Sequence, residues 1–113
     1  MVQNRKKLIQ LLIGNLSNYV VHAVLAEAIE DDGIMERYRK EGLTSFRLAE
    51  GYRERIHPKR EVFSGKDVVH IRVCVGQRTR NELRKRICRG YEGIDLGLVE
   101  VYVERALVLI GIV

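Results

Sequence analysis

Residues 4–30 read NRKKLIQLLIGNLSNYVVHAVLAEAIE, and this stretch decides the fold. Apolar side chains recur in it at steps of three and four residues, which is the period of one face of an α-helix. Apolar residues also stand on both sides of that face, among them Ile9, Ile13 and Val21. A helix that is apolar around most of its surface needs neighbours around most of its surface. The stretch therefore predicts a long helix that is central in the fold or buried by a second chain.

The next stretch predicts a second helix over residues 34–56. An Asp-Asp-Gly turn precedes it, in which Gly33 suits the left-handed conformation that ends many helices. Seven residues form a heptad-like seam along the second helix, and those in its middle are small: Met35, Tyr38, Gly42, Ser45, Ala49, Tyr52 and Ile56. Small residues let two helix backbones approach closely, so we expect residues 4–30 and 34–56 to pair as a long antiparallel hairpin. Pro58 should end the second helix.

The second half of the chain fits two periods. Residues 68–75 and 98–113 contain alternating apolar and polar side chains, which is typical of β-strands. The same residues fit helices, with Asp95 as an N-cap and the apolar residues between Val99 and Ile110 on one face. We expect a mainly α protein, a small helical bundle built on the N-terminal hairpin. The alternative is an α+β fold, in which the hairpin packs on a small antiparallel sheet formed by residues 68–75 and 98–113.

Between these segments lies the most basic part of the sequence. Thr79 and Glu82 have the spacing of a capping box, which predicts a helix over residues 79–90 that begins at Thr79. Six basic residues on and around this helix are candidates for binding nucleic acid: Arg78, Arg80, Arg84, Lys85, Arg86 and Arg89. Guanidinium groups fork onto phosphate oxygens, and their binding releases condensed counterions. Because only Tyr91 is near enough to stack on a base, such binding should be directed at the backbone and tolerant of sequence. A charged helix face that is simply solvated is the competing interpretation.

Length and composition are those of a single globular domain spanning residues 1–113. The formal net charge of the chain is +5. The chain has two cysteines, Cys74 and Cys88, which are too few for a disulfide scaffold. Polar residues interrupt the apolar N-terminal stretch, so we expect a cytoplasmic protein with neither a signal peptide nor a membrane span. Abundant Arg, Glu and Val with little Gln and Asn is typical of thermophilic proteins.

Two groups of acidic residues resemble the metal-binding pairs of all-helical nucleoside triphosphate pyrophosphohydrolases. The first group is Glu27, Glu30, Asp31, Asp32 and Glu36, and the second is Glu92 with Asp95. The resemblance implies a hydrolase in which carboxylates from facing helices hold Mg²⁺. In that family the two pairs lie on neighbouring helices with a much shorter gap between them. A solvated turn and a helix cap explain the same residues.

Arg53 and His57 resemble the Arg-to-His motif of the HEPN-type ribonucleases, which are also all-helical. The resemblance implies that the arginine and histidine of two subunits face each other at a dimer interface and polarise the scissile phosphate. The spacing here is one residue shorter than in the family, and Glu54 stands where a polar residue follows the arginine. His57 also suits a helix C-terminus, where an imidazolium interacts favourably with the helix dipole.

The remaining features indicate an interaction protein more than an enzyme. His70 and Cys74 share a face but form only half of a zinc site, so we predict no metal, no cofactor and no catalytic residues. The apolar run from Leu107 to Val113 must dock in the core or meet another subunit. We predict a small helical interaction module that forms a homodimer and binds nucleic acid through residues 78–89. A small hydrolase of either kind described above is the alternative.

Overall fold

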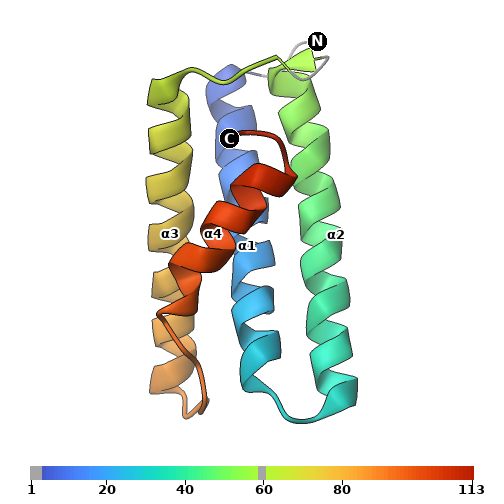
Figure 1. The fold of residues 1–113 in the computed structure, drawn as a ribbon, viewed down its shortest axis with the longest axis vertical. Helices are drawn as coiled ribbons and strands as arrows, with labels where there is room; N and C mark the ends of the chain where they lie inside the picture. The colour runs from blue at the N-terminus through green and yellow to red at the C-terminus, as the bar shows by residue number, and fades with distance from the viewer. Residues whose placement is uncertain (1–3, 59–60) are drawn as a thin grey trace.

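The computed structural model describes residues 4–58 and 61–113. These residues form helices α1 (Arg5–Ala28), α2 (Asp32–Ile56), α3 (Gly65–Cys88) and α4 (Leu98–Leu109), and they contain no strand (Figure 1). The expectation of a mainly helical protein is confirmed, and the alternative with a sheet from residues 68–75 and 98–113 is wrong.

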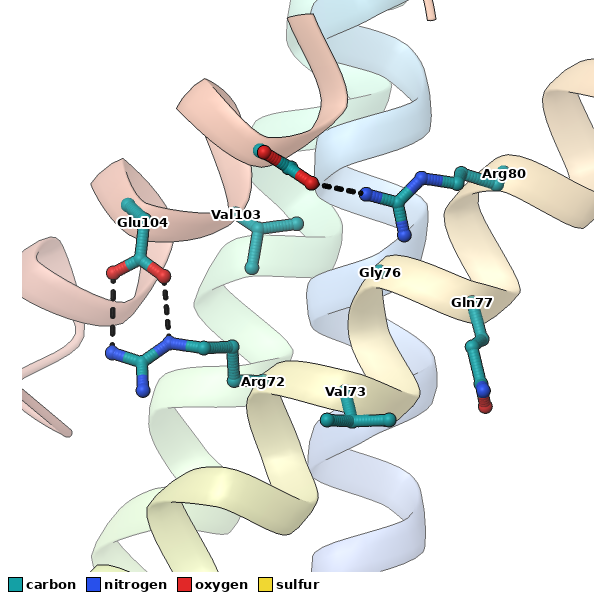
Figure 2. A pocket seen from close by; sticks show the side chains of 8 residues that line it. Arg72, Val73, Gly76, Gln77, Arg80, Val103 and Glu104 are labelled. Carbon is teal, nitrogen blue, oxygen red and sulfur yellow. Dashed lines mark hydrogen bonds and ion pairs between the residues drawn. The ribbon is translucent and has the colours of Figure 1, made fainter. Parts of the chain in front are cut away.

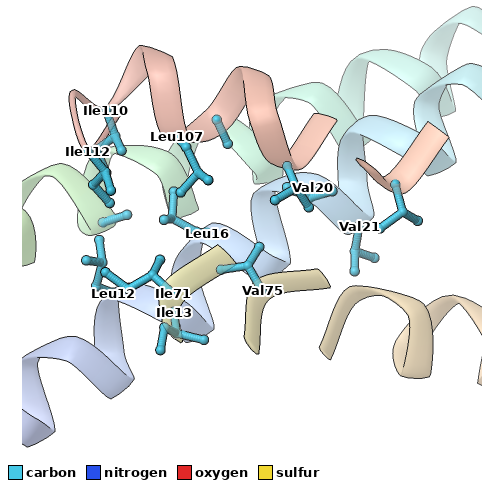
Figure 3. Packing of buried hydrophobic residues seen from close by; sticks show 14 of the residues in the cluster. Leu12, Ile13, Leu16, Val20, Val21, Ile71, Val75, Leu107, Ile110 and Ile112 are labelled. Carbon is cyan, nitrogen blue, oxygen red and sulfur yellow. The ribbon is translucent and has the colours of Figure 1, made fainter. Parts of the chain in front are cut away.

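Helix α1 is the centre of the arrangement. It lies between α2 and α3, while α4 crosses diagonally over α1 and α3 (Figure 1). Among the helices, α2 contacts only α1. By length and composition α1 could also cross a membrane, but here its apolar side chains are covered by the other helices. Leu12, Leu16 and Val20 are fully buried, and residues of α3 and of the C-terminal segment surround them (Figure 3).

The turn between α1 and α2 differs from the prediction at Gly33. Helix α1 ends at Ala28, and α2 already begins at Asp32 because the Asp31 carboxylate accepts a hydrogen bond from the backbone N–H of Ile34 (3.0 Å). Gly33 therefore lies within the first turn of α2, and the prediction that it takes a left-handed conformation is wrong.

The small residues of α2 face α1. A Cβ added at Gly42 would lie 3.1 Å from the Cβ of His22, so a larger residue would push the two helices apart. Nearby, the Ser45 hydroxyl accepts a hydrogen bond from the Asn18 side chain. The two helices lie side by side and run in opposite directions (Figure 1).

Helix α3 begins much earlier than the predicted start at Thr79. The Ser64 hydroxyl accepts a hydrogen bond from the backbone N–H of Asp67 (3.1 Å) and caps the helix. The helix then continues for 24 residues, with Ile71, Val75, Thr79 and Leu83 fully buried on one face. Thr79 is thus a core residue in the middle of a helix, and the capping box at this position is wrong.

Helix α4 follows the helical period of its sequence. Four fully or almost fully buried residues, Val99, Val103, Ala106 and Leu107, face the core. Asp95 is not the N-cap residue as predicted, because the helix is preceded by Gly97, and the Asp95 carboxylate accepts from the Gly97 N–H (2.8 Å). After α4 the chain turns back at Gly111 (φ 79°), and Ile110 and Ile112 dock into the core (Figure 3).

Candidate nucleic-acid interface

The outer face of α3 carries a row of polar and basic side chains near the C-terminal end of the helix. Asn81, Arg84, Lys85, Cys88 and Arg89 recur at steps of three and four residues and line a shallow hollow of about 520 Å³. All five residues are exposed. We call the three cations among them, Arg84, Lys85 and Arg89, the basic row.

The basic row has no internal counter-ion. Within residues 4–58 and 61–113, no carboxylate forms an ion pair or hydrogen bond with any of its three side chains. The one acidic residue of this part of α3, Glu82, instead pairs with Arg86. The basic row therefore presents its full charge to solvent.

Of the other three predicted residues, Arg80 and Arg86 pair with carboxylates of the chain and Arg78 stays exposed. Arg80 donates to Glu100 of α4 across 3.0 Å. The Nε of Arg86 lies 3.4 Å from a Glu82 oxygen, and its guanidinium carbon lies 5.6 Å from the centre of the Tyr91 ring. Arg78 is exposed and reaches towards α1, because its Nη1 lies 3.4 Å from the place that a Cβ of Gly14 would take. The structure thus leaves four of the six candidates available to a ligand: Arg78, Arg84, Lys85 and Arg89.

A better-formed cavity of about 370 Å³ lies between α3 and α4 (Figure 2). Gly76 and Val103 lie between two ion pairs that cross from one helix to the other. Arg72 donates from Nε and Nη2 to the two oxygens of Glu104 (2.6 and 3.2 Å), and Arg80 pairs with Glu100. The two ion pairs join α4 to α3. Because both arginines are neutralised, the cavity offers no free cation to an anion.

These cross-helix pairs were missed from the sequence. Their partners are 20 and 32 residues apart, and no local spacing relates them. The available signal is that Arg72 and Arg80 are eight residues apart on one helix while Glu100 and Glu104 are four apart on the other, so each pair shares a face.

Arg53 and His57 occupy structural positions. Arg53 is only 5 % exposed, and its guanidinium donates to the carbonyl oxygens of His57 (3.4 Å), Glu61 (3.4 Å) and Gly111 (2.8 Å). The Arg53 side chain therefore points into the interior of the protein and connects the end of α2 to the C-terminal segment. The His57 ring packs edge-on against Phe63, with 4.5 Å between ring centres.

The acidic residues of the described chain do not form the two metal-binding pairs that the resemblance implies. Glu27 accepts a hydrogen bond from the Tyr102 hydroxyl (2.6 Å), and this bond raises the pKa of Tyr102 above its ordinary value. Glu92 and Asp95 lie on the loop before α4. This loop contacts the end of α1 at Ala28, but the two acids come from a loop and not from a neighbouring helix as the resemblance requires. In the described part of the chain, no three His, Cys, Asp or Glu side chains are placed to hold a metal ion.

The remaining polar groups give no second candidate of comparable strength. His70 and Cys74 lie together on α3, with 3.7 Å between Nδ1 and Sγ, and no third ligand within the described residues joins them. A hollow of about 320 Å³ between α1, α2 and α4 is lined by three tyrosines with Glu27 and Arg39. Burial raises the pKa of one of them, Tyr38, above its ordinary value.

Comparison of the chain with protein-family models, curated proteins and solved structures finds no match. The described residues define a class of protein, an all-helical chain whose helix α3 carries the basic row on its outer face.

Proposed function

We propose that this protein binds nucleic acid through its phosphates, without reading the base sequence, on the outer face of α3. The observation that carries the proposal is the basic row, three exposed cations on one helix face with no acidic partner among the described residues. Arg78 extends this surface towards the N-terminal half of α3. Cations that are not neutralised by their own chain attract phosphates and release counterions on binding.

The dimensions of the surface fit a short stretch of nucleic-acid backbone. At a rise of about 1.5 Å per residue, Arg78 to Arg89 span about 16 Å of α3. This length corresponds to about five nucleotides of one strand of a B-form duplex, at 3.4 Å per nucleotide. Up to four cationic side chains along this part of α3 can therefore contact three or four phosphates.

The chemistry of the surface favours phosphates over bases. Asn81 is the one side-chain amide that lines the hollow beside the basic row. Tyr91, the nearest aromatic residue, is covered on one side by Arg86. Base-edge readout requires several amides or guanidiniums in fixed positions, and stacking requires open aromatic faces. We therefore expect similar affinity for duplexes of different sequence.

The proposal is tested by charge reversal. The triple variant Arg84→Glu, Lys85→Glu, Arg89→Glu removes the basic row, and its affinity for a labelled duplex is measured by fluorescence anisotropy at about 50 mM salt. We expect the affinity to fall by at least about a hundredfold, because three favourable contacts become repulsive. Circular dichroism should show unchanged helix content, because all three side chains are exposed.

A matched control separates the surface from the net charge. Arg37→Glu, Lys40→Glu and Arg47→Glu change three exposed cations of α2 and lower the net charge by the same amount. This control should retain most of the affinity. Equal losses in both triple variants, or no binding by the wild type at low salt, would contradict the proposal.

A further inference from the structure

The outward face of α4 is an apolar surface that the described chain leaves uncovered. Val101, Glu104, Arg105, Val108 and Leu109 recur at helical spacing and line a shallow hollow of about 490 Å³. Val101 is 45 % exposed, and Val108 and Leu109 are each 60 % exposed. The opposite face of α4 supplies the buried residues of the core, so this helix is apolar on both sides.

Charge is arranged asymmetrically along this face. Glu104 lies on the edge towards α3, where it pairs with Arg72 (2.6 Å). Arg105 lies on the opposite edge, and its guanidinium carbon is 5.1 Å from the ring centre of Tyr102, whose hydroxyl reaches Glu27 of α1. Val101 and Val108 stand between the two edges, one turn before and one turn after the charged residues. The face thus has the half-exposed carboxylate of the Arg72–Glu104 pair on one edge, an apolar centre, and the cation Arg105 on the other edge.

We propose that this face binds a second copy of the chain, with the two α4 helices packed in parallel about a two-fold axis. A parallel two-fold arrangement brings the Glu104 edge of each helix onto the Arg105 edge of the other. The exposed half of Glu104 then accepts from Arg105 of the other copy in addition to Arg72 of its own chain. Val101 and Val108 then each pack against their own counterpart, as β-branched residues do in parallel helix pairs. An antiparallel pair would instead place Glu104 against Glu104 and Arg105 against Arg105.

The face is small for a protein interface. Twelve residues of helix are about 18 Å long, which is short for a protein interface. Val73 of α3, which is 48 % exposed, lines the neighbouring cavity between α3 and α4, and that cavity shares Glu104 with this face (Figure 2). An interface of this extent belongs to the weak class, so we expect dimers to form at about micromolar concentration and above.

Sedimentation velocity over a range from about 1 µM to about 1 mM tests whether a dimer forms on this face. The sedimentation coefficient of the wild type should rise with concentration, and Val108→Asp should raise the dimer Kd at least about tenfold. Leu48→Asp is the matched control, because Leu48 is a 53 % exposed apolar residue on α2, which α4 does not contact. A wild type that stays monomeric throughout, or equal effects of the two variants, would overturn the proposal.

Disulfide cross-linking tests the orientation, in a chain whose two natural cysteines, Cys74 and Cys88, are replaced by serine. In the parallel dimer, Val108→Cys should cross-link to a second copy of itself on oxidation, because the two Cα atoms lie within disulfide range. Leu48→Cys should not cross-link. Cross-linking that occurs only when Val101→Cys is mixed with Val108→Cys would show antiparallel packing, and the absence of cross-linking in every combination would also overturn the proposal.

Discussion

At the scale of single residues, Arg53 joins two distant parts of the chain. Its buried guanidinium donates to three carbonyl oxygens, and its loss removes these hydrogen bonds from a partly buried site. It joins the end of α2 to Gly111, which is 58 residues away in the sequence. The arginine of an Arg-to-His ribonuclease motif would need to face its substrate, whereas this one faces the inside of its own chain.

The prediction for this residue concerns stability. Arg53→Met should lower the free energy of unfolding by about 2–4 kcal/mol, because it keeps most of the volume and removes the three donors. Urea unfolding followed by circular dichroism measures the change. Arg47→Met, at an exposed position on α2, should change the free energy of unfolding by less than about 0.5 kcal/mol. An Arg53 variant as stable as the wild type would contradict the structural role of this side chain.

Asp67 gives the molecule a pH-dependent contact between α1 and α3. A hydrogen bond from Arg5 lowers the pKa of Asp67 below its ordinary value of 3.8. A carboxyl group with a lowered pKa in the folded state stabilises the fold fully above its unfolded value and loses that contribution as the pH falls through the folded value.

Asp67→Asn should therefore lower the stability at pH 7 by about 0.5–1 kcal/mol, since the pair is partly exposed. The difference between the variant and the wild type should shrink below pH 3.8 and disappear below the lowered folded pKa. Thermal unfolding at several pH values measures it. A difference that stays constant from pH 7 to acid would show that the ion pair contributes nothing.

At the scale of helices, α3 shows how far the sequence predicts this fold. The first two helices were predicted within two residues of their observed ends, the first from apolar residues at steps of three and four and the second from its heptad-like seam. In α3 the exposed residues Val69 and Val73 alternate with polar ones, which imitates a strand. The buried series Ile71, Val75, Thr79 and Leu83 is the helical signal, and a threonine at its third position hid it.

The candidate site was predictable only in part for the same reason. The basic composition of residues 78–89 is visible in the sequence, but which cations remain free depends on α4. Glu100 pairs with Arg80 and neutralises its charge, and no local pattern relates residues that are 20 apart and lie on different helices. Arg84, Lys85 and Arg89 remain because no helix covers their side of α3.

Thr79 provides the prediction at this scale. It is fully buried, and its hydroxyl has no hydrogen-bond partner. Thr79→Val has nearly the same shape and removes a buried unsatisfied group, so it should raise the free energy of unfolding by about 0.5–1.5 kcal/mol. Thr79→Ser keeps the hydroxyl and leaves a methyl-sized gap, so it should be destabilising. A loss of stability in Thr79→Val would show that the hydroxyl makes a stabilising hydrogen bond and would contradict this account of the site.

At the scale of the whole molecule, the central position of α1 determines which surfaces are available to partners. Helices α2 and α3 flank it on opposite sides, so each keeps an open outer face (Figure 1). The face of α2 mixes acidic and basic residues along its length, whereas α3 ends in the basic row. The predicted homodimer and the predicted nucleic-acid surface use different helices, α4 and α3, and each can be removed by substitution without altering the other.

The salt dependence of binding tests the central claim most directly. Anisotropy titrations of the wild type with a labelled duplex at about 50 and about 200 mM salt should show the affinity falling by at least about 40-fold, which corresponds to three phosphate contacts. Arg84→Gln should reduce the slope of log K against log salt by about one. Binding with no salt dependence, or a slope that Arg84→Gln leaves unchanged, would contradict a phosphate-binding function of the basic row.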